Sequence, residues 1–329
     1  MYLEHWGLEC PPFRITPDTR RFYTGARRGD ILQALEYAVL GGEGIVKVSG
    51  EVGSGKTMLC RMLEERLADR LEVVYLGNPS LSPVEVLRAI ALEMGLAPAP
   101  DEGHLQLIQR LHQALLERCA RGRAVVVFIE EAQSMSPAAL EEIRLLSNLE
   151  TGSRKLLQMV LFGQPELDGT LARPEIRQLK ERITQNFHLP PFRRREIADY
   201  LRFRMAGAGY RGPDVFTRGA VRRIARASRG LARRVSILAD KALLAAYARG
   251  SHRVTGRHVK LAVADSDFGV LVPRRRPWLR PALAGIGLGL MAAGGWWAAA
   301  HWSLAWPDPT AAVERMSLLL ADAFTEARP

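Results

Sequence analysis

Short apolar runs alternate with amphipathic stretches through the first part of the chain. The run at 124–129 is apolar throughout, which is typical of a parallel strand covered on both faces. We expect five strands, at 45–49, 72–76, 124–129, 156–162 and 186–189. Helices are expected at 31–40, with Asp30 as its cap, and at 56–68, 83–94, 104–119 and 137–149. This order predicts an α/β fold with a parallel sheet between helical layers.

The pattern changes near residue 193, after which the apolar runs stop and only helical periodicity continues. Four helices are expected there, at 197–205, 216–227, 233–248 and 256–264. We therefore predict an α/β domain over 1–192 and a small all-helical domain over 193–268.

A third region is uncharged. Residues 281–307 contain no Asp, Glu, Lys or Arg, and about 20 apolar residues span a bilayer. We predict a basic juxtamembrane linker over 269–280, a single C-terminal transmembrane helix over 281–303 and a short tail over 304–329. A buried core helix, or one lying on the membrane, is the alternative. Four arginines precede the segment and the N-terminus lacks a signal peptide, so both domains are expected on the cytoplasmic side and the tail outside.

The positive charge is concentrated in the second half of the chain. Residues 193–280 carry 22 Lys and Arg against 6 Asp and Glu, while the remainder carries 24 against 29. This bias predicts a polyanionic neighbour, either lipid headgroups or nucleic acid. Four arginines share one face of an expected helix, and a solvated face without a partner is the alternative: Arg218, Arg222, Arg226 and Arg229. The three cysteines are scattered, which excludes a disulfide framework and a zinc site.

A glycine-rich loop follows the first expected strand. The run GEVGSGKT at 50–57 matches the phosphate-binding pattern G-x-x-x-x-G-K-[ST] in full, between a strand and a helix. Its backbone N–H groups and the helix N-terminus can bind phosphates, Lys56 can reach the β- and γ-phosphates, and Thr57 can hold Mg²⁺. We assign nucleotide contacts to Gly50, Gly53, Ser54, Gly55, Lys56, Thr57 and Met58. The sequence thus predicts ATP and Mg²⁺ as cofactors.

Polar residues follow two later strands. Glu130 and Glu131 end the strand at 124–129, and we place Glu130 with Thr57 on the metal side and assign Glu131 to the attacking water. A solvated acidic turn is the alternative. Gln164 ends the strand at 156–162 and is expected beside the γ-phosphate, an ordinary loop exit being the alternative.

Several longer runs resemble AAA+ ATPases of the ExeA/GspA secretion group, and within it the MshM-like proteins of MSHA (type IV) pilus biogenesis. They are MYLEHWGL at 1–8, PF at 12–13, GEVGSGKT at 50–57, EEAQ at 130–133, LEEIRLLSNLET at 140–151, LFGQPEL at 161–167, LKERI at 179–183 and GLAR at 230–233. The resemblance implies a nucleotide domain with a helical lid, a homo-oligomer, and an ATPase at the bacterial inner membrane whose partners are secretion or pilus assembly proteins. Membrane lipid is then the expected anion and nucleic acid is not.

The resemblance also implies roles for two arginines. In ring ATPases a basic residue near Arg182 reaches a neighbour's site and stabilises transition-state charge, with Arg177 and Lys180 as rivals. Arg233 would bend back towards the nucleotide as a sensor, with Arg234 as its rival. Solvated surface arginines are the alternative for both.

Two departures from the family pattern shape the expectation. Glu130 stands where the family has Asp, so hydrolysis is expected to be slow, and the tail after residue 306 is too short for the peptidoglycan-binding domain of ExeA-type members. We expect a membrane-anchored ATPase that supports assembly of a type II secretion or pilus complex. A DNA-binding transposition-helper ATPase and a nucleotide-bound scaffold with little hydrolysis are the alternatives.

Overall fold

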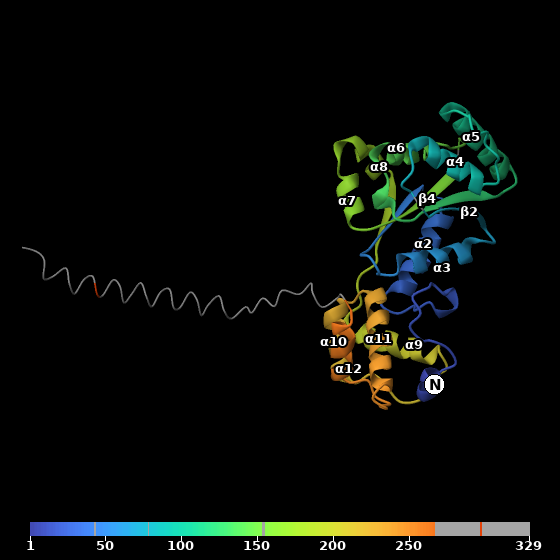
Figure 1. Cartoon of the computed structure of the whole chain (residues 1–329). Coiled ribbons are helices and arrows are strands. Elements are labelled where there is room, and N and C mark those ends of the chain that lie inside the picture. Colours follow the sequence, from blue (N-terminus) through green and yellow to red (C-terminus); the bar gives the residue numbers. More distant parts are fainter. Residues whose placement is uncertain (43, 78, 153–154, 267–296, 298–329) are drawn as a thin grey trace, which may run out of the picture. The chain divides into compact units, whose positions relative to one another are not determined.

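The computed structural model describes residues 1–42, 44–77, 79–152, 155–266 and 297 (Figure 1). Residues 1–269 form one compact unit. The predicted linker, transmembrane helix and tail lie outside the described residues, apart from Trp297. Within the ranges just given, no helix is both long and apolar enough to cross a membrane.

Five parallel strands form one sheet in the order β2-β3-β4-β1-β5. They are β1 (Ile45–Ser49), β2 (Leu71–Leu76), β3 (Ala124–Ile129), β4 (Leu157–Gly163) and β5 (Ile183–His188). This confirms the predicted parallel sheet. The fifth strand begins three residues before its predicted start, because Thr184 and Gln185 interrupt the apolar pattern. These polar residues are tolerated since β5 is an edge strand and their side chains are exposed.

Helices cover both faces of the sheet (Figure 1). One core joins the sheet to α4 (Pro83–Glu93), α5 (His104–Ala120) and α6 (Pro137–Leu146), and the other joins it to α2 (Arg28–Leu40) and α3 (Lys56–Leu67). Two short helices, α7 (Glu166–Leu171) and α8 (Arg177–Glu181), were not predicted. Asp30 is not the cap of α2, because the helix begins at Arg28 behind a left-handed Arg27. The helix predicted to reach residue 149 ends at Leu146.

The second domain packs four helices around its own core (Figure 1). They are α9 (Arg194–Ala206), α10 (Arg218–Ser228), α11 (Ala232–Tyr247) and α12 (Gly256–Ala264). The first residues of the chain also belong to this core, since Trp6, from α1 (Tyr2–Trp6), Leu8 and Phe13 pack among these helices. The N-terminal segment was predicted to belong to the α/β domain, but its apolar side chains are buried with the helical one.

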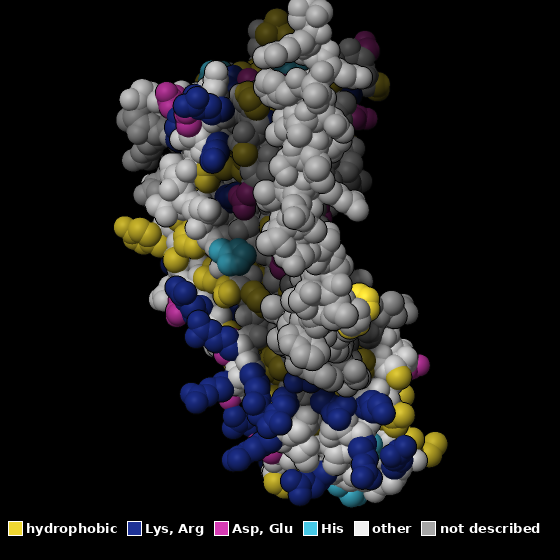
Figure 2. Space-filling view, turned by 90° about the vertical axis from the view of Figure 1, so that its left-hand side faces the viewer, with side chains coloured by type: hydrophobic (Ala, Val, Ile, Leu, Met, Phe, Trp, Pro, Cys, Tyr) yellow, Lys and Arg dark blue, Asp and Glu magenta, His cyan; other side chains and the backbone are white. Residues whose placement is uncertain are grey.

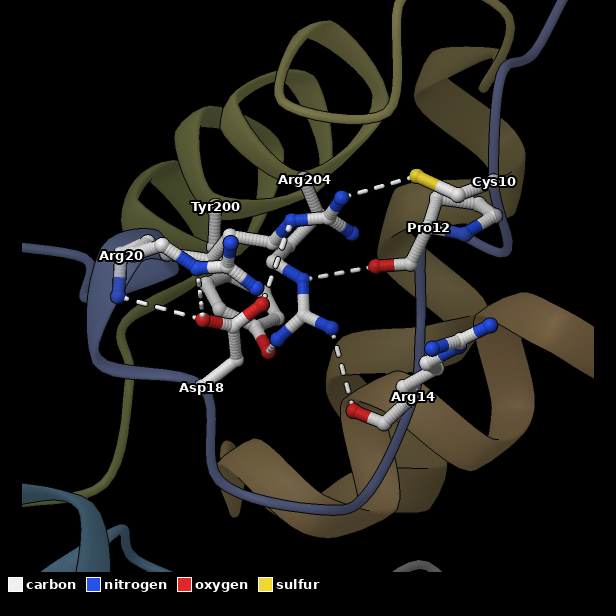
Figure 3. A network of polar contacts seen from close by, with 8 residues as sticks. Cys10, Pro12, Arg14, Asp18, Arg20, Tyr200 and Arg204 are labelled. Atoms are coloured by element: carbon white, nitrogen blue, oxygen red, sulfur yellow. Dashed lines mark hydrogen bonds and ion pairs between the residues drawn. The ribbon is translucent and has the colours of Figure 1, made fainter.

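A buried arginine fastens the N-terminal segment to the helical domain (Figure 3). Arg204 of α9 donates hydrogen bonds to the carbonyl oxygens of Pro12, at 2.7 Å, and Arg14, at 3.0 Å, and to the Tyr200 hydroxyl, at 3.2 Å. The Tyr200 hydroxyl in turn pairs with Ser236 of α11 at 2.8 Å. This network satisfies backbone carbonyls that no secondary structure would otherwise satisfy, and so it fixes the path of the segment across the helices.

Candidate nucleotide-binding site

The glycine loop connects β1 to α3 in the conformation that a phosphate-binding loop requires. Gly53 (φ 78°) and Gly55 (φ 108°) adopt left-handed conformations that other residues resist. A Cβ on Gly53 would lie 2.9 Å from the Cβ of Arg233, so side chains larger than hydrogen are excluded there. The Lys56 ammonium is buried and donates to the carbonyl oxygens of Gly50, at 2.7 Å, and Glu51, at 3.3 Å. Burial lowers the pKa of Lys56, and the charges of Glu131 and Glu130 oppose that shift.

Ser54 shows that the loop fits an anionic ligand. Its hydroxyl oxygen is fully buried and has no hydrogen-bond partner among the described residues. A buried hydroxyl without a partner is unfavourable unless a ligand or water supplies one. The loop ends at the N-terminus of α3, a helix of 12 residues whose first N–H groups need acceptors. The loop therefore fits a polyphosphate.

The residues assigned to the metal also meet. The Thr57 hydroxyl donates to one carboxylate oxygen of Glu130 at 3.3 Å, while the other oxygen is buried without a partner in the described part of the chain. Burial raises the pKa of Glu130, and the nearby Tyr75 and Thr57 hydroxyls oppose the shift. A hydroxyl beside a carboxylate with a free oxygen is a donor set that Mg²⁺ accepts, because this hard cation prefers oxygen ligands.

Glu131 is held by two glutamines. Its backbone is left-handed (φ 50°), and one of its carboxylate oxygens accepts hydrogen bonds from the side-chain amides of Gln133, at 2.6 Å, and Gln164, at 2.9 Å. The backbone N–H of Gln164 donates to the Gln133 side-chain oxygen at 3.0 Å, which closes the cluster. Burial alone would raise the pKa of Glu131, but the hydrogen bonds from Gln164 and Gln133 and the charge of Lys56 outweigh it, so this pKa is lowered.

The structure places the two predicted arginines differently. The backbone N–H of Arg233, at the start of α11, donates to the Gly53 carbonyl at 3.0 Å, and its side chain lines the same cavity as the loop. Arg182 follows α8 and donates to the Ser147 hydroxyl at 3.2 Å. It does not line that cavity. Its predicted role in the site of a neighbouring subunit stays a prediction.

A cavity of about 530 Å³ lies over the loop, between the sheet domain and the helical domain. Among the predicted site residues, Gly53, Ser54, Gly55, Lys56, Thr57, Met58, Glu131 and Arg233 line it, whereas Gly50, Glu130 and Gln164 do not. Much of the remaining wall was not predicted, and it consists of Arg14, Ile15, Phe22, Tyr23, Arg28, Phe192, Tyr200 and Ser236 among others. The volume is in the range of small-molecule sites. The N-terminal segment and the lid thus enclose a ligand whose phosphates would lie on the loop.

Two residues that the sequence reasoning missed brace the site. Gln133 joins Glu131 to Gln164, and its position directly after two carboxylates was the available signal. Arg28 is 5% exposed, donates to the Ser54 carbonyl at 3.0 Å and lies over the Phe192 ring at 3.8 Å. Burial lowers its pKa to about 10. No motif surrounds Arg28, so its role depends on contacts that only the fold creates.

Comparisons with known proteins agree with this geometry. Residues 39–171 match a family described as AAA domain. The chain is 39% identical over 297 residues to General secretion pathway protein A from Aeromonas hydrophila, a match that covers 90% of this chain and 54% of the relative. The chain thus spans about half the length of that relative.

Solved structures with a similar fold are distant in sequence. The Aeropyrum pernix ORC2 protein is 20% identical with a TM-score of 0.57, over 79% of this chain and 72% of its own. CDC6P from Pyrobaculum aerophilum is 18% identical with a TM-score of 0.58, over 75% and 71%. Drosophila ORC bound to DNA is 17% identical with a TM-score of 0.58, over 94% and 82%. These likenesses show the fold alone. The AAA domain at 39–171 and the similarity to General secretion pathway protein A over 90% of this chain support an AAA+ protein of the ExeA/GspA type, as its motifs predict.

Proposed function

We propose that this chain binds Mg-ATP in the cavity over the glycine loop and hydrolyses it to ADP and phosphate. One observation carries the proposal: a buried lysine, an unpartnered serine hydroxyl and two carboxylates meet at the end of one parallel sheet. Carboxyl ends of parallel strands are where α/β folds bind ligands. The charges there are arranged for a phosphate chain beside a divalent cation.

Each residue then has a distinct task. The loop N–H groups and Lys56 bind the phosphates, and Lys56 leaves its contact with the Gly50 carbonyl to do so. Thr57 and Glu130 would hold Mg²⁺, which when bound would neutralise negative charge on the phosphate chain as ADP leaves. Glu131 orients and deprotonates the attacking water, and its lowered pKa keeps it ionised at neutral pH. Gln164 lies beside it and would donate to the γ-phosphate.

Two arginines would complete the site from other elements. Arg233 of the lid would contact the phosphates and report their presence, because its helix already bonds to the loop at Gly53. Arg182 would act on the neighbouring subunit of a homo-oligomer, where it stabilises charge in the transition state. The boundary near 192 then separates the nucleotide domain from the lid, and the lid ends near 268. The N-terminal segment belongs to the lid as well.

The proposed task of this ATPase is assembly of a secretion or MSHA-type pilus complex at the bacterial inner membrane. The similarity to a general secretion pathway protein and the uncharged segment at 281–303 support this, and that segment would anchor the chain with the ATPase on the cytoplasmic side. Inner-membrane assembly proteins are the expected partners. The alternatives are a transposition-helper-type ATPase that binds DNA and a scaffold that binds ATP with little hydrolysis.

ATP turnover by residues 1–269, the compact unit, tests the proposal. It is measured with and without duplex DNA, with Lys56→Ala as the blank. We expect Mg²⁺-dependent turnover that the blank lacks and that DNA leaves unchanged. Strong stimulation by DNA would favour the transposition-helper alternative. ATP binding with turnover no faster than the blank would favour the scaffold, and Glu130→Asp would then be the next variant.

A further inference from the structure

The outer face of α10 is almost entirely arginine. Its exposed residues are Arg218, Gly219, Arg222, Arg223 and Arg226, and its remaining residues are buried or half-buried. We call the four arginines the arginine face. Figure 2 shows Lys and Arg side chains gathered over the lower part of the molecule, where Figure 1 places the helical domain.

This face destabilises its own helix. Arg218, Arg222 and Arg226 follow one another at four-residue spacing, at which like charges repel. The first turn of α10 has no acidic residue, so the positive end of the helix dipole meets Arg218 instead of a carboxylate. Several exposed arginines elsewhere in the molecule do have acidic partners, as in the pairs Arg177–Glu181 and Arg202–Asp199. No residue of the arginine face forms an ion pair within the described ranges.

The positive surface continues onto α12. A Cβ on Gly256 would lie 3.0 Å from the Arg223 side chain, so the start of α12 adjoins the arginine face, and Arg257 and Lys260 are exposed on that helix. Residues 215–264 contain 12 Lys and Arg and one acid, Asp240. Such a surface attracts a polyanion over its whole extent and has no local acid to weaken the attraction.

We propose that the arginine face docks the lid on the anionic headgroups of a phospholipid leaflet. The exposed positions of α10 and α12 hold no aromatic residue on which bases could stack, which argues against single-stranded nucleic acid, and duplex DNA is tested below as the rival ligand. Leu261 is 44% exposed next to Lys260, and an apolar side chain among basic ones suits the membrane interface. The choice of a lipid rests in part on the membrane anchoring proposed above.

Vesicle co-sedimentation of residues 1–269 tests this docking, because the fragment lacks the uncharged segment. Vesicles of phosphatidylcholine alone are compared with vesicles that also contain phosphatidylglycerol, and duplex DNA is titrated separately. The test variant is the triple Arg218→Gln, Arg222→Gln, Arg226→Gln. The control triple removes the same charge from the sheet domain, at Arg121, Arg123 and Arg173, which are also exposed. ATP turnover of every variant is measured in parallel.

We expect binding only to the anionic vesicles, lost at high salt. Each basic residue near an anionic surface contributes a factor of about five, so the test triple should bind on the order of 100-fold more weakly. The control triple should bind nearly as the parent. Equal losses in both triples would mean that net charge alone binds, and binding to duplex DNA but not to vesicles would assign the face to nucleic acid. Either result overturns the proposal, as does a fragment that binds neither. If the test triple kept normal ATP turnover, its vesicle binding would report on the docking proposal alone and not on the proposed ATPase activity.

Discussion

Gln133 offers the sharpest test of how Glu131 is prepared for catalysis. Its side-chain amide donates to the Glu131 carboxylate at 2.6 Å, and its side-chain oxygen accepts the Gln164 backbone N–H at 3.0 Å. Gln133→Leu keeps the approximate size of the side chain and removes both interactions. We expect turnover to fall while ATP binding persists, because Gln133 does not line the cavity over the phosphate loop.

The size of the effect follows from the acceptor. A hydrogen bond to a charged group contributes about 1.5–3 kcal/mol, and about 1.4 kcal/mol corresponds to a factor of ten in rate. Gln164 still donates to the same carboxylate, so Glu131 keeps one of its two amide partners. We therefore expect kcat to fall about 10- to 100-fold, with KM for ATP changed by less than about threefold.

The pH dependence separates a positioning role from a general loss of structure. The base must be ionised, and the hydrogen bonds from Gln164 and Gln133 lower the pKa of Glu131 against the effect of burial. Removing one of them raises this pKa from its lowered value. The acidic limb of the kcat profile in Gln133→Leu should therefore move to higher pH, and the loss of activity should shrink as pH rises.

Gln109→Leu is the matched control, because Gln109 is exposed on α5. It should match the parent in kcat, KM and pH profile. If Gln133→Leu lowered kcat by the same factor at every pH, the variant would have lost geometry and not basicity. If kcat were unchanged, the cluster around Glu131 would have no part in hydrolysis and the assignment of Glu131 as the base would lose its main structural support.

Three further variants test other parts of the site. Glu130→Gln should raise the Mg²⁺ concentration for half-maximal turnover at least about 10-fold, measured by titration with MgCl₂ at fixed ATP; an unchanged midpoint would exclude Glu130 from the metal site. Arg233→Ala removes one charged contact to phosphate and should weaken ATP binding about 10-fold by fluorescent-nucleotide titration, whereas unchanged binding and turnover would end its role as a sensor. Arg204→Ala leaves the Pro12 and Arg14 carbonyls without their donor and should destabilise the fold by about 2–4 kcal/mol; thermal unfolding of residues 1–269 with Arg202→Ala as the exposed control checks this, and equal melting temperatures would refute it.

The sheet could be predicted because its strands have strong local signals. β3 is apolar at every position and β1 is buried throughout, since both are covered on two faces, and their predicted bounds are correct. β5 was placed three residues late because an edge strand tolerates the polar pair Thr184 and Gln185. The predicted cap of α2 was also wrong because of a tertiary contact. Asp30 is a good capping residue, but the left-handed turn at Arg27, which brings Arg28 against the phosphate loop, starts the helix earlier.

The candidate site likewise has one part that local sequence signals predict and one part that they do not. The glycine loop, with Thr57 at its end, follows β1, the pair Glu130 and Glu131 follows β3, and Gln164 follows β4. A parallel sheet therefore brings these residues together at one edge, whatever the rest of the fold does. The walls formed by the N-terminal segment and the lid had no such signal. They are held together by tertiary contacts such as the Arg204 network, and contacts between residues about 190 positions apart are not encoded in any local pattern.

The helical domain contacts the phosphate loop directly, and this constrains how ATP would be sensed. The Arg233 backbone bonds to the Gly53 carbonyl at 3.0 Å, and the Gly230 carbonyl accepts the Phe192 N–H at 2.8 Å where the chain enters the lid. A Cβ on Gly230 would lie 2.3 Å from the Phe192 carbonyl oxygen, so this crossing leaves no free space. A phosphate chain that shifts the loop backbone at Gly53 would therefore be felt at the start of α11. Because α10, which carries the arginine face on its outer side, packs on α11, a shift of α11 would link nucleotide state to the proposed membrane docking.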